Sequence, residues 1–557
     1  MRVNLIGNFE AKGLSQDAML LRGLITNQFG KEASLRNIYH KMPQCPEADL
    51  NIFIEVLNPS LFTYAGKNVL VPNPEWTYKT WIPYLSMLDE IWVKTKEAEE
   101  IFKEWNPKFI GWTSIDKVFA EKKKYHKAIA LVGRNMFRNP KPIIKAYNDI
   151  MNEDYDMYKR LPELHIPFKK SDIQFHVPSN IDKIFLYDEL TEEKYDELLH
   201  ECGLAICISL AEGFGHAVNE AMSAGCNLLL SPIGAFQELT DVALWSSPMQ
   251  EMEHPDCMCT ILDSSSKSIR ECLEEYVLTP FKTKKQRSLK VREIYEKRHA
   301  TFVESFKIPE YPVYSLSDTL QKETDLPDVS IITLTYNRKE FLPLAKYSYM
   351  IQSYPEDKLE WVIVNDGESI EEDLIGISNV KYIQLSEKTS IGEKRNIGVK
   401  NAMYDTICMM DDDDVYPNNS ILERVAMLLK TPQKECVFCT TIPCYDIEKY
   451  TSFMNVPPIT IPMSQRVSEA TLCFNKKFWE ERKFEGEMSE GDKFIQGREQ
   501  MCREISPQEV IVSLVHSKNT SDRKTPEGEP NGCHYGFNEK LYAVVSEIGE
   551  TLKTHAE

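Results

Sequence analysis

The chain has 557 residues, several times the usual length of a domain, so two or more domains are expected, each with its own core. Apolar residues make up 42% and charged residues 27%, which is an ordinary globular composition. The 85 acidic and 65 basic side chains give a net charge of −20, which argues against nucleic acid as a partner.

No apolar stretch reaches the length of about 20 residues that a membrane span needs, and the first residues, MRVNLIGNFEAKG, lack the apolar core of a signal peptide. The 14 cysteines lie mostly inside apolar runs such as GLAICISL and form no regular framework. Cys436 and Cys439 have the spacing of half a zinc site, but no second ligand pair follows, so we place them in a strand. We therefore expect a cytoplasmic protein with buried thiols and without a membrane span.

Strand-like apolar runs alternate with amphipathic helical patterns along most of the chain, which predicts an α/β architecture with parallel sheets. The segment from Phe306 to Asp328 breaks this rhythm with three prolines and little periodicity, so we interpret it as a connection between two halves. A further division of the first half is expected where the charged KVFAEKKKYHK precedes the strand AIALVG. The predicted units are residues 1–120, 121–307, a linker at 308–326, and 327–557.

The most informative stretch of the first half is LAICISLAEGFGHAVNEAMSAGCNLLLS, from Leu204 to Ser231. It predicts a strand, a loop that contains glycines, a helix from about His216 to Ser223, and a second strand. Loop glycines expose backbone N–H groups at the N-terminus of a helix, which is an anion site suited to a diphosphate. Glu212 and Glu220 flank this site.

This block resembles the retaining GT-B glycosyltransferases of the family 4 type, whose signature is two glutamates separated by seven residues. Glu212 and Glu220 match that spacing, and EGFG, EAMSAG and Glu238 match the surroundings. The resemblance implies two Rossmann-like subdomains, an acceptor side in residues 1–120 and a donor side in 121–307 that ends in a return helix. It also implies that Glu220 binds the donor ribose, that Glu212 is catalytic and faces the transferred sugar, and that phosphate is contacted by the backbone of Gly213, Phe214, Gly215 and His216.

Weaker matches extend over about residues 1–305. GNFEAKGLSQDAMLL, which contains Gly13, resembles the first loop of the family, and ALVGRNMFRNPKPIIKAY resembles the segment whose arginine and lysine hold the diphosphate. Arg134 takes the arginine position, whereas Asn139 stands at the lysine position, so either Arg138 or Lys141 substitutes or donor binding is impaired. This half needs no metal if its basic residues and helix N-terminus neutralise the diphosphate.

In the second half, the apolar runs VSIITLTYN, LEWVIVNDG, VKYIQLSEK and TICMMDDDD each end in polar residues: Asn337 and Arg338, Asn365 and Asp366, Glu387 and Lys388, and Asp411 to Asp414. Ligands of open parallel sheets bind at the carboxyl ends of the strands, so these ends should converge on one crevice. At the end of an extended strand, Asp411 and Asp413 would project to one side and Asp412 and Asp414 to the other. Such carboxylates suit Mg²⁺ or Mn²⁺ that takes its other ligands from water and a diphosphate.

Three other interpretations compete for the four aspartates. An EF-hand that begins at Asp412 fails, because Pro417 stands where the calcium loop requires glycine. A solvated acidic loop is disfavoured by the strand that precedes the aspartates. A nucleotidyl- or phosphotransferase would usually show a glycine loop that cradles phosphate, and none is apparent.

VSIITLTYNR, WVIVNDGES, IGEKRNIGVKNA and MMDDDDVYPNNSIL resemble, in that order and spacing, the nucleotide-binding half of family 2 glycosyltransferases, which have the GT-A fold. The resemblance covers about residues 327–520. It implies that the donor site contains Asn337, Asp366 and Arg395, with Asp366 on the nucleotide base. It also implies a DxD-type site for metal and sugar nucleotide at Asp411 and Asp413, and the metal ligand stays open between Asp413 and Asp414.

Enzymes of this kind use a late carboxylate to deprotonate the acceptor hydroxyl, which is otherwise a poor nucleophile. The best match is MSEGDKFIQGR, in which Asp492 follows Gly491 where the family usually has Glu-Asp, so Glu490 is a rival base. His516 is a candidate for a further metal or phosphate contact, with an ordinary surface histidine as the alternative. The segment from Asn519 to Phe537 is expected to form a mobile lid.

Together these patterns predict a bifunctional glycosyltransferase. The first half would be retaining and metal-independent, and the second would be inverting and dependent on Mn²⁺ or Mg²⁺. The expected partners are UDP-, GDP- or dTDP-sugars and a glycan acceptor that receives successive sugars. Two alternatives remain: only the GT-A half is catalytic while the GT-B half binds or orients the glycan, or the whole chain is a non-catalytic carbohydrate-binding scaffold.

Overall fold

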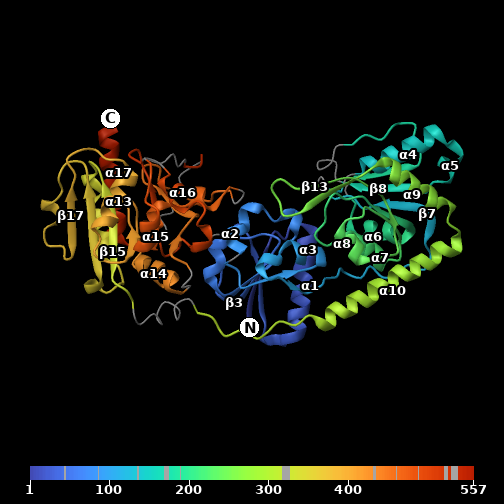
Figure 1. Cartoon of the computed structure of the whole chain (residues 1–557), viewed down its shortest axis with the longest axis horizontal. Helices are drawn as coiled ribbons and strands as arrows, with labels where there is room; N and C mark the ends of the chain where they lie inside the picture. Colours follow the sequence, from blue (N-terminus) through green and yellow to red (C-terminus); the bar gives the residue numbers. More distant parts are fainter. Residues whose placement is uncertain are drawn as a thin grey trace.

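The computed structural model describes the chain except for residues 43–44, 86, 134–136, 139, 169–174, 189, 316–325, 431–433, 459–460, 487–488, 520–524, 528–536 and 557. Figure 1 shows three α/β bodies in a row. The first subdomain, which contains strands β1 to β6, lies in the middle; the second subdomain, β7 to β14, lies on the right; the C-terminal domain, β15 to β24, lies on the left.

The first subdomain is built on a parallel sheet with the strand order β2-β1-β3-β4-β5-β6. Its strands are β1 (Arg2–Gly7), β2 (Ser34–Tyr39), β3 (Ala48–Ile54), β4 (Ala65–Val71), β5 (Glu90–Val93) and β6 (Lys108–Phe109). Its helices are α1 (Lys12–Phe29), α2 (Ile82–Leu85) and α3 (Lys96–Ile101). All seven residues of β3 are buried, as expected for a central strand that is covered on both faces.

The second subdomain has a second parallel sheet, with the order β12-β11-β10-β7-β8-β9. Its strands are β7 (Lys124–Ala130), β8 (Glu163–Phe168), β9 (Ile184–Asp188), β10 (Cys202–Cys207), β11 (Asn227–Leu230) and β12 (Leu244–Trp245), and a hairpin is formed by β13 (Pro248–Glu253) and β14 (Thr260–Ser264). Its helices are α4 (Lys141–Glu153), α5 (Tyr155–Arg160), α6 (Glu192–Glu201), α7 (His216–Ser223), α8 (Gly234–Leu239) and α9 (Ser266–Leu278). The long helix α10 (Phe281–Ser305) then runs beneath the second subdomain back toward the first (Figure 1).

The C-terminal domain has a mainly parallel sheet with the order β17-β16-β15-β18-β22-β19-β23, in which β22 runs antiparallel to both of its neighbours. Its strands are β15 (Val329–Thr335), β16 (Leu359–Asn365), β17 (Val380–Gln384), β18 (Thr406–Met409), β19 (Cys436–Phe438), β22 (Cys473–Asn475) and β23 (Cys502–Glu504). A small sheet pairs β20 (Ile442–Asp446) with β21 (Thr451–Asn455) and β24 (Ser513–Val515). The helices are α12 (Leu342–Met350), α13 (Ile391–Asn401), α14 (Ser420–Lys430), α15 (Lys476–Glu481), α16 (Glu490–Ile495) and α17 (Glu539–Ala556).

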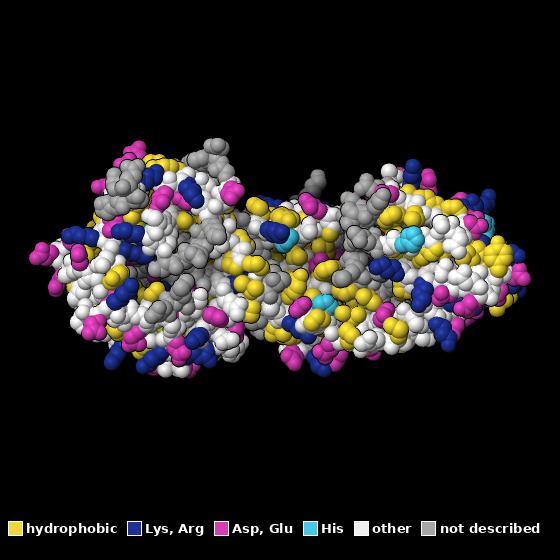
Figure 2. Space-filling model, turned by 90° about the horizontal axis from the view of Figure 1, so that it is seen from above, with side chains coloured by type: hydrophobic (Ala, Val, Ile, Leu, Met, Phe, Trp, Pro, Cys, Tyr) yellow, Lys and Arg dark blue, Asp and Glu magenta, His cyan; other side chains and the backbone are white. Residues whose placement is uncertain are grey.

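These three sheets confirm the predicted α/β fold class, with two parallel sheets in the first half and a mainly parallel one in the second. Cys436 begins the buried strand β19 and Cys439 is buried just after it, as predicted. None of the helices within the described ranges combines the length and apolarity that crossing a bilayer requires. Acidic and basic side chains are interspersed over the face that Figure 2 shows.

The chain after α10 does not leave the first subdomain at once. Phe306 and Ile308 belong to a buried cluster to which both parallel sheets of the first half contribute. The Tyr314 hydroxyl donates to the Thr63 carbonyl at 2.6 Å, and its backbone N–H donates to Asp49 Oδ1 at 3.0 Å. The segment that the sequence predicts as a linker is therefore packed onto the first subdomain over its described part, up to residue 315, because apolar and aromatic side chains alternate with its prolines.

The first subdomain and the C-terminal domain share a buried junction. Apolar side chains of both contribute to one cluster, among them Trp81 and Leu85 on one side and Met463 on the other. At its centre, the fully buried Tyr84 hydroxyl accepts a hydrogen bond from the Arg466 guanidinium and faces the Glu504 carboxylate. Burial and Glu504 raise the pKa of Tyr84 well above its ordinary value, so the hydroxyl stays neutral.

We expect Tyr84→Phe to reduce the free energy of unfolding by about 1–3 kcal/mol, because a buried cation and a buried carboxylate lose the hydroxyl between them. Urea denaturation checks this value, with Tyr39→Phe as the control, since Tyr39 is 41% exposed in the same subdomain. Equal stabilities of the two variants would show that the hydroxyl contributes nothing to the junction.

Two candidate active sites

The four aspartates lie directly after β18, at the carboxyl edge of the C-terminal sheet. Strands β15 and β16 are parallel to β18, so the residues that follow them lie at the same edge. Arg338, which follows β15, donates from Nη1 to Asp412 Oδ1 at 3.1 Å and to Asp413 Oδ2 at 2.7 Å. Polar residues from separate strand ends therefore meet here, as the sequence predicts.

Asp413 also faces the segment that follows β24. His516 Nε2 lies 3.3 Å from Asp413 Oδ2, and Asn519 Nδ2 donates to the same oxygen at 3.4 Å. Burial alone would raise the pKa of Asp413, but the contacts with His516 and Arg338 lower it to about 2. Asp413 is therefore ionised throughout the neutral range.

Asp412 and Asp411 behave differently from Asp413. Burial and the neighbouring Asp413 raise the pKa of Asp412 to about 7, and its Oδ2 atom has no hydrogen-bond partner among the described residues. Burial also raises the pKa of Asp411, which lies near Arg395. Close carboxylates cannot all ionise easily, and the contacts with His516 and Arg338 make Asp413 more acidic than Asp411 and Asp412.

The predicted alternation of the four side chains is wrong. β18 ends at Met409, and Asp412 and Asp413 lie in a turn, so their side chains do not follow the geometry of an extended strand. Arg338 consequently reaches both of them. Asp414 Oδ1 accepts from the backbone N–H of Leu514 at 3.0 Å and so fixes β24 beside the aspartates.

The spacing of Asp413 and His516 is close to that of two ligands of a divalent cation. However, His516 Nδ1 accepts from the Lys518 backbone N–H at 3.2 Å, so a metal at Nε2 would require that hydrogen bond to be replaced. Two ligand atoms in adjacent octahedral positions, each about 2.1 Å from the metal, are about 3.0 Å apart. Asp413 Oδ2 and His516 Nε2 are 3.3 Å apart, close to this value. The described residues contain no group of three or more His, Cys, Asp or Glu side chains placed to hold a metal, so these two would need water and a diphosphate as further ligands.

Asp366 lies at the end of β16 and is held by two donors. Lys394 Nζ donates to Oδ1 at 2.7 Å, and the Thr389 backbone N–H donates to Oδ2 at 2.9 Å. Asn337 lies nearby with a positive φ of 50°, and its Oδ1 accepts from the Glu368 backbone N–H at 2.9 Å. The sequence predicted Asp366 and Asn337, but not the buried Lys394, whose partner is 28 residues away.

Arg395 connects the aspartates to α16, where the two candidate bases lie. Its Nε donates to Glu490 Oε1 at 2.7 Å, and its Nη1 lies 3.5 Å from Asp411 Oδ1. Glu490 is thus buried in an ion pair. Asp492 is only half buried, and its Oδ1 atom is buried without a hydrogen-bond partner in the described part of the chain.

The glycine at position 491, where the resemblance leads one to expect glutamate, has a physical reason. The Gly491 backbone N–H donates to Glu469 Oε1 at 3.0 Å, and a Cβ atom on residue 491 would lie 2.8 Å from that oxygen. A larger residue would displace Glu469. Burial and Glu490 raise the pKa of Glu469 to about 7.

In the first half, helix α7 begins at His216 directly after the loop that contains Gly213 and Gly215. Gly215 has φ +92°, and a Cβ atom there would lie 2.7 Å from the Phe236 ring, so only glycine fits. Gly13 on α1 faces the same place, because a Cβ atom on it would lie 4.0 Å from His216. Phe214 is buried beside the loop.

Asp17, on α1, is buried at this junction of the two subdomains. It accepts hydrogen bonds from Lys94 Nζ at 2.6 Å and from Trp112 Nε1 at 2.6 Å, and His216 Nε2 lies 2.8 Å from its Oδ1. Burial would raise the pKa of Asp17, but Lys94 and His216 hold it well below its ordinary value. The sequence did not predict Asp17 or Lys94 as site residues. Asp17 could have been found from the motif that contains Gly13, because it lies one helical turn after that glycine.

The two signature glutamates have protein partners. Glu220 Oε1 accepts from Gln16 Nε2 at 2.7 Å. Glu212 accepts two hydrogen bonds from Arg138, at 2.8 Å and 2.7 Å. Lys141 is the exposed first residue of α4, and Arg134 and Asn139 lie outside the described residues. Of the basic residues considered for the diphosphate, Arg138 is thus the one that the structure places against a signature glutamate.

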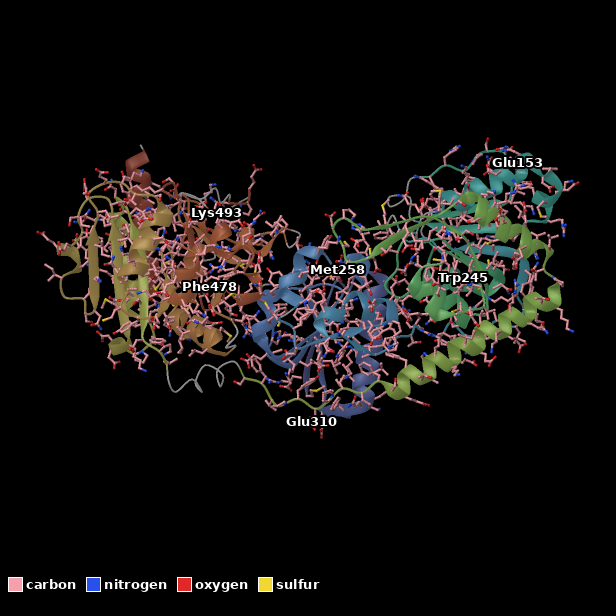
Figure 3. The ribbon with its side chains drawn as sticks, viewed as in Figure 1. Glu153, Trp245, Met258, Glu310, Phe478 and Lys493 are labelled. Carbon is pink, nitrogen blue, oxygen red and sulfur yellow. The ribbon has the colours of Figure 1, made fainter. Side chains whose placement is uncertain are left out.

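The two subdomains are also joined away from these glutamates. Glu238 accepts from the backbone N–H groups of Lys96 and Glu97 at 2.7 Å and 2.8 Å, and Glu97 accepts from that of Ala235 at 2.8 Å. The tip of the β13–β14 hairpin reaches the first subdomain, where the backbone N–H of Met258, labelled in Figure 3, donates to the Thr77 carbonyl at 2.9 Å. The two subdomains are therefore in direct contact at these places.

Comparison with known proteins gives two family matches. Residues 330–482 match the family described as Glycosyl transferase family 2, and residues 179–241 match Glycosyl transferases group 1. The chain carries glycosyltransferase domains of both types. An uncharacterized glycosyltransferase of Rickettsia prowazekii (strain Madrid E) is 32% identical over 117 residues, which is 20% of this chain and 36% of the relative. One of Rickettsia typhi is 29% identical over 124 residues, 22% of this chain and 38% of the relative.

Solved structures of other proteins also match parts of this chain. S. aureus TarS 1–349 has 16% identity and a TM-score of 0.26, over 34% of this chain and 60% of that chain. A mannosyltransferase from Pyrobaculum calidifontis, solved with GDP-Man and Mn²⁺, has 17% identity and a TM-score of 0.27, over 36% of this chain and 63% of that chain. The chain thus spans just over a third of the two curated relatives and less than two thirds of these two solved chains.

Proposed function

We propose that the C-terminal domain transfers a sugar, with inversion, from a nucleotide-sugar donor to an acceptor hydroxyl, and that it requires Mn²⁺ or Mg²⁺. The observation that carries this proposal is the ionised Asp413 beside His516, at the same sheet edge as Asp366. Asp413 and His516 would hold the cation, with Asp414 fixing the adjacent strand. When bound, the cation would neutralise charge on the leaving diphosphate.

The side chains around this site divide the remaining work. Asp366, held in position by Lys394 and Thr389, would accept hydrogen bonds from the nucleotide base. Arg338 is held against the aspartates and would contact the diphosphate. Asp492 would take the proton of the acceptor hydroxyl, because its unpartnered Oδ1 can accept it, whereas Glu490 is engaged by Arg395.

We expect Asp492→Asn to lower kcat by about 10²–10⁴-fold with little change in the KM of the donor, as is typical for loss of a general base. Steady-state transfer rates with Mn²⁺ check this, with Glu490→Gln as the comparison. Glu490→Gln should act mainly on stability, because it weakens the buried ion pair with Arg395. If Glu490→Gln were stable but inactive in transfer while Asp492→Asn remained active, Glu490 and not Asp492 would be the general base.

For the first half we propose a retaining, metal-independent transfer in the cleft between the two subdomains. The N-terminus of α7 would accept the donor diphosphate, Glu220 the ribose, and Glu212 would face the transferred sugar. Arg138 supports this proposal, because it supplies a cation next to Glu212 at 2.7 Å. Donors would be UDP-, GDP- or dTDP-sugars, and the acceptor a glycan.

The two sites in one chain favour successive transfers to one growing glycan, because the product of one site remains at high effective concentration near the other. Mass spectrometry of the product tests this order when both donors are supplied. We expect a product with both sugars. A product with a single added sugar would contradict successive transfer.

A second candidate function is that the first half only binds or orients the glycan. It is favoured by the side-chain partners of Glu212, Glu220 and His216, which a donor would have to displace. Nucleotide release from a panel of UDP-, GDP- and dTDP-sugars, with and without EDTA, separates the two proposals. Release that resists EDTA and is lost in Glu220→Ala supports two enzymes, whereas release that is entirely EDTA-sensitive and unaffected by Glu220→Ala supports the second candidate.

A further inference from the structure

Glu75 is a buried carboxyl that none of the roles above uses. It lies in the short 3₁₀ turn Pro74–Trp76 that follows β4, and only 6% of the residue is exposed. Its Oε2 atom has no hydrogen-bond partner among the described residues. A Cβ atom on Gly213 would lie 2.8 Å from this same oxygen. A side chain of the first subdomain thus places an unsatisfied oxygen directly against the loop that begins α7 in the second subdomain.

The described cations at this junction of the two subdomains are already paired with other carboxylates. Lys94 contacts Asp17, and Arg138 makes two hydrogen bonds with Glu212. Glu55, which lies behind Glu75, instead accepts a hydrogen bond from Asn73 Nδ2 at 2.6 Å. Glu212 and Glu55 oppose the ionisation of Glu75, whereas the backbone N–H groups of Gly213 and of Glu75 itself favour it.

Burial and Glu212 raise the pKa of Glu75 to about 8, and burial raises that of Glu55 to about 7. Glu75 is therefore mainly a neutral carboxyl at pH 7, which can donate one hydrogen bond and accept others. A buried polar atom without a partner costs about 1–3 kcal/mol. A ligand with both a donor and an acceptor at one atom would remove that cost, and a sugar hydroxyl is such a group.

We propose that Glu75 binds a sugar hydroxyl at the junction of the two subdomains of the first half, opposite Gly213 and near Glu212. This inference rests on the proposed transferase function of that half. The hydroxyl belongs either to the transferred sugar or to the acceptor, because Glu75 comes from the acceptor-side subdomain and touches the donor-side loop. Asn73 supports the site, since its Oδ1 lies 2.6 Å from the position of a Cβ atom on Gly213 and accepts from Lys94.

The test uses the full chain with Mn²⁺ omitted and EDTA present, and a panel of UDP-glucose, UDP-galactose, GDP-mannose and dTDP-rhamnose as probes. Glu75→Met removes the hydrogen bonds at similar size, and Glu75→Gln retains a donor and an acceptor. Glu104→Met and Glu104→Gln, at an exposed position of the same subdomain, are the matched controls. Thermal unfolding of each variant confirms that it is folded.

We expect Glu75→Met to lower the EDTA-resistant kcat/KM by about 10–100-fold, and Glu75→Gln to retain most of it at pH 7. A raised KM for the nucleotide sugar with an unchanged Kd for the free nucleoside diphosphate assigns the hydroxyl to the transferred sugar. A raised KM for the saccharide acceptor alone assigns it to the acceptor. The proposal would be overturned if Glu75→Met had the same EDTA-resistant kcat/KM as Glu104→Met. It would also be overturned if Glu75→Met weakened binding of the free nucleoside diphosphate as much as it lowered kcat/KM.

The pH profile provides an independent readout. A carboxyl with a raised pKa of about 8 keeps its proton below that pH and loses it above, so wild-type kcat/KM should fall as the pH rises through 8. The groups that face Glu75 are Glu55, Glu212, Cys257 and Cys259, and burial raises the pKa of both thiols. Glu75→Gln should lack this fall, and its persistence there would contradict the role of Glu75. If the wild type and Glu220→Ala released nucleotide at the same rate in EDTA, the proposed function of this half would be overturned, and this inference with it.

Discussion

Asp413→Ala should abolish the metal-dependent transfer, with a loss of about 10²–10⁴-fold in kcat/KM, because the substitution removes several kcal/mol of charge stabilisation at the diphosphate. Asp413 is the ionised carboxylate beside His516, whereas burial and the neighbouring Asp413 raise the pKa of Asp412 to about 7. The EDTA-resistant release should be unchanged. Initial rates over a Mn²⁺ titration measure both quantities.

The control for this substitution is Asp405→Ala, at an exposed position immediately before β18. Asp414→Ala addresses the ligand that the sequence left open: because Asp414 accepts from the Leu514 backbone, its loss should lower stability more than metal affinity. If Asp414→Ala raised the Mn²⁺ requirement strongly and Asp413→Ala did not, the assignment of the metal ligand would have to be reversed.

Asp17→Ala should destabilise the first half by about 3–5 kcal/mol, because it leaves Lys94 as a buried cation without its carboxylate. The side chains of both residues are only 1% exposed, and their atoms are 2.6 Å apart. Urea denaturation followed by far-UV circular dichroism measures the loss. The double variant Asp17→Leu with Lys94→Met should recover much of it, since replacement of a whole buried ion pair by apolar groups is often neutral or stabilising.

The pH dependence of this contribution follows from the direction of the shift. The folded pKa of Asp17 is held well below the ordinary value of 3.8, so the stabilisation is present above about pH 4 and is lost as the pH falls toward the folded pKa. Asp17→Asn should be less sensitive to acid over that range. Equal stability of wild type and Asp17→Ala at pH 7 would contradict the account of this junction.

Local patterns predicted much of the fold. Apolar runs such as β3 and β16 are buried along their full length, and the predicted glycine loop precedes α7. The need for glycine at 215, with its positive φ and the nearby Phe236 ring, was not predicted. The aspartates lie at the end of a buried strand because the apolar run before them ends at Met410. Each of these predicted features is determined by residues that are close together in the sequence, so the local pattern of apolar and polar residues is enough to predict it.

Contacts between distant segments could not be predicted in the same way. Tyr84 and Arg466 are 382 positions apart, and Gln16 and Glu220 are 204 apart. Whether a carboxylate such as Glu75 is ionised also depends on burial and on neighbours from three segments, which no local spacing reveals. The alternation predicted for Asp411 to Asp414 failed for a related reason, because a turn begins where the sequence suggested an extended strand.

The central claim, two nucleotide sites in one chain, is tested most directly by isothermal titration of the full chain with UDP, GDP and dTDP, with Mn²⁺ and then with EDTA. With Mn²⁺ we expect two distinct nucleotide sites per chain, whether one nucleotide fills both or two nucleotides fill one each. One site should disappear with EDTA or Asp413→Ala, and the other with Glu220→Ala. A single site that is lost with EDTA and unaffected by Glu220→Ala would contradict a donor site in the first half.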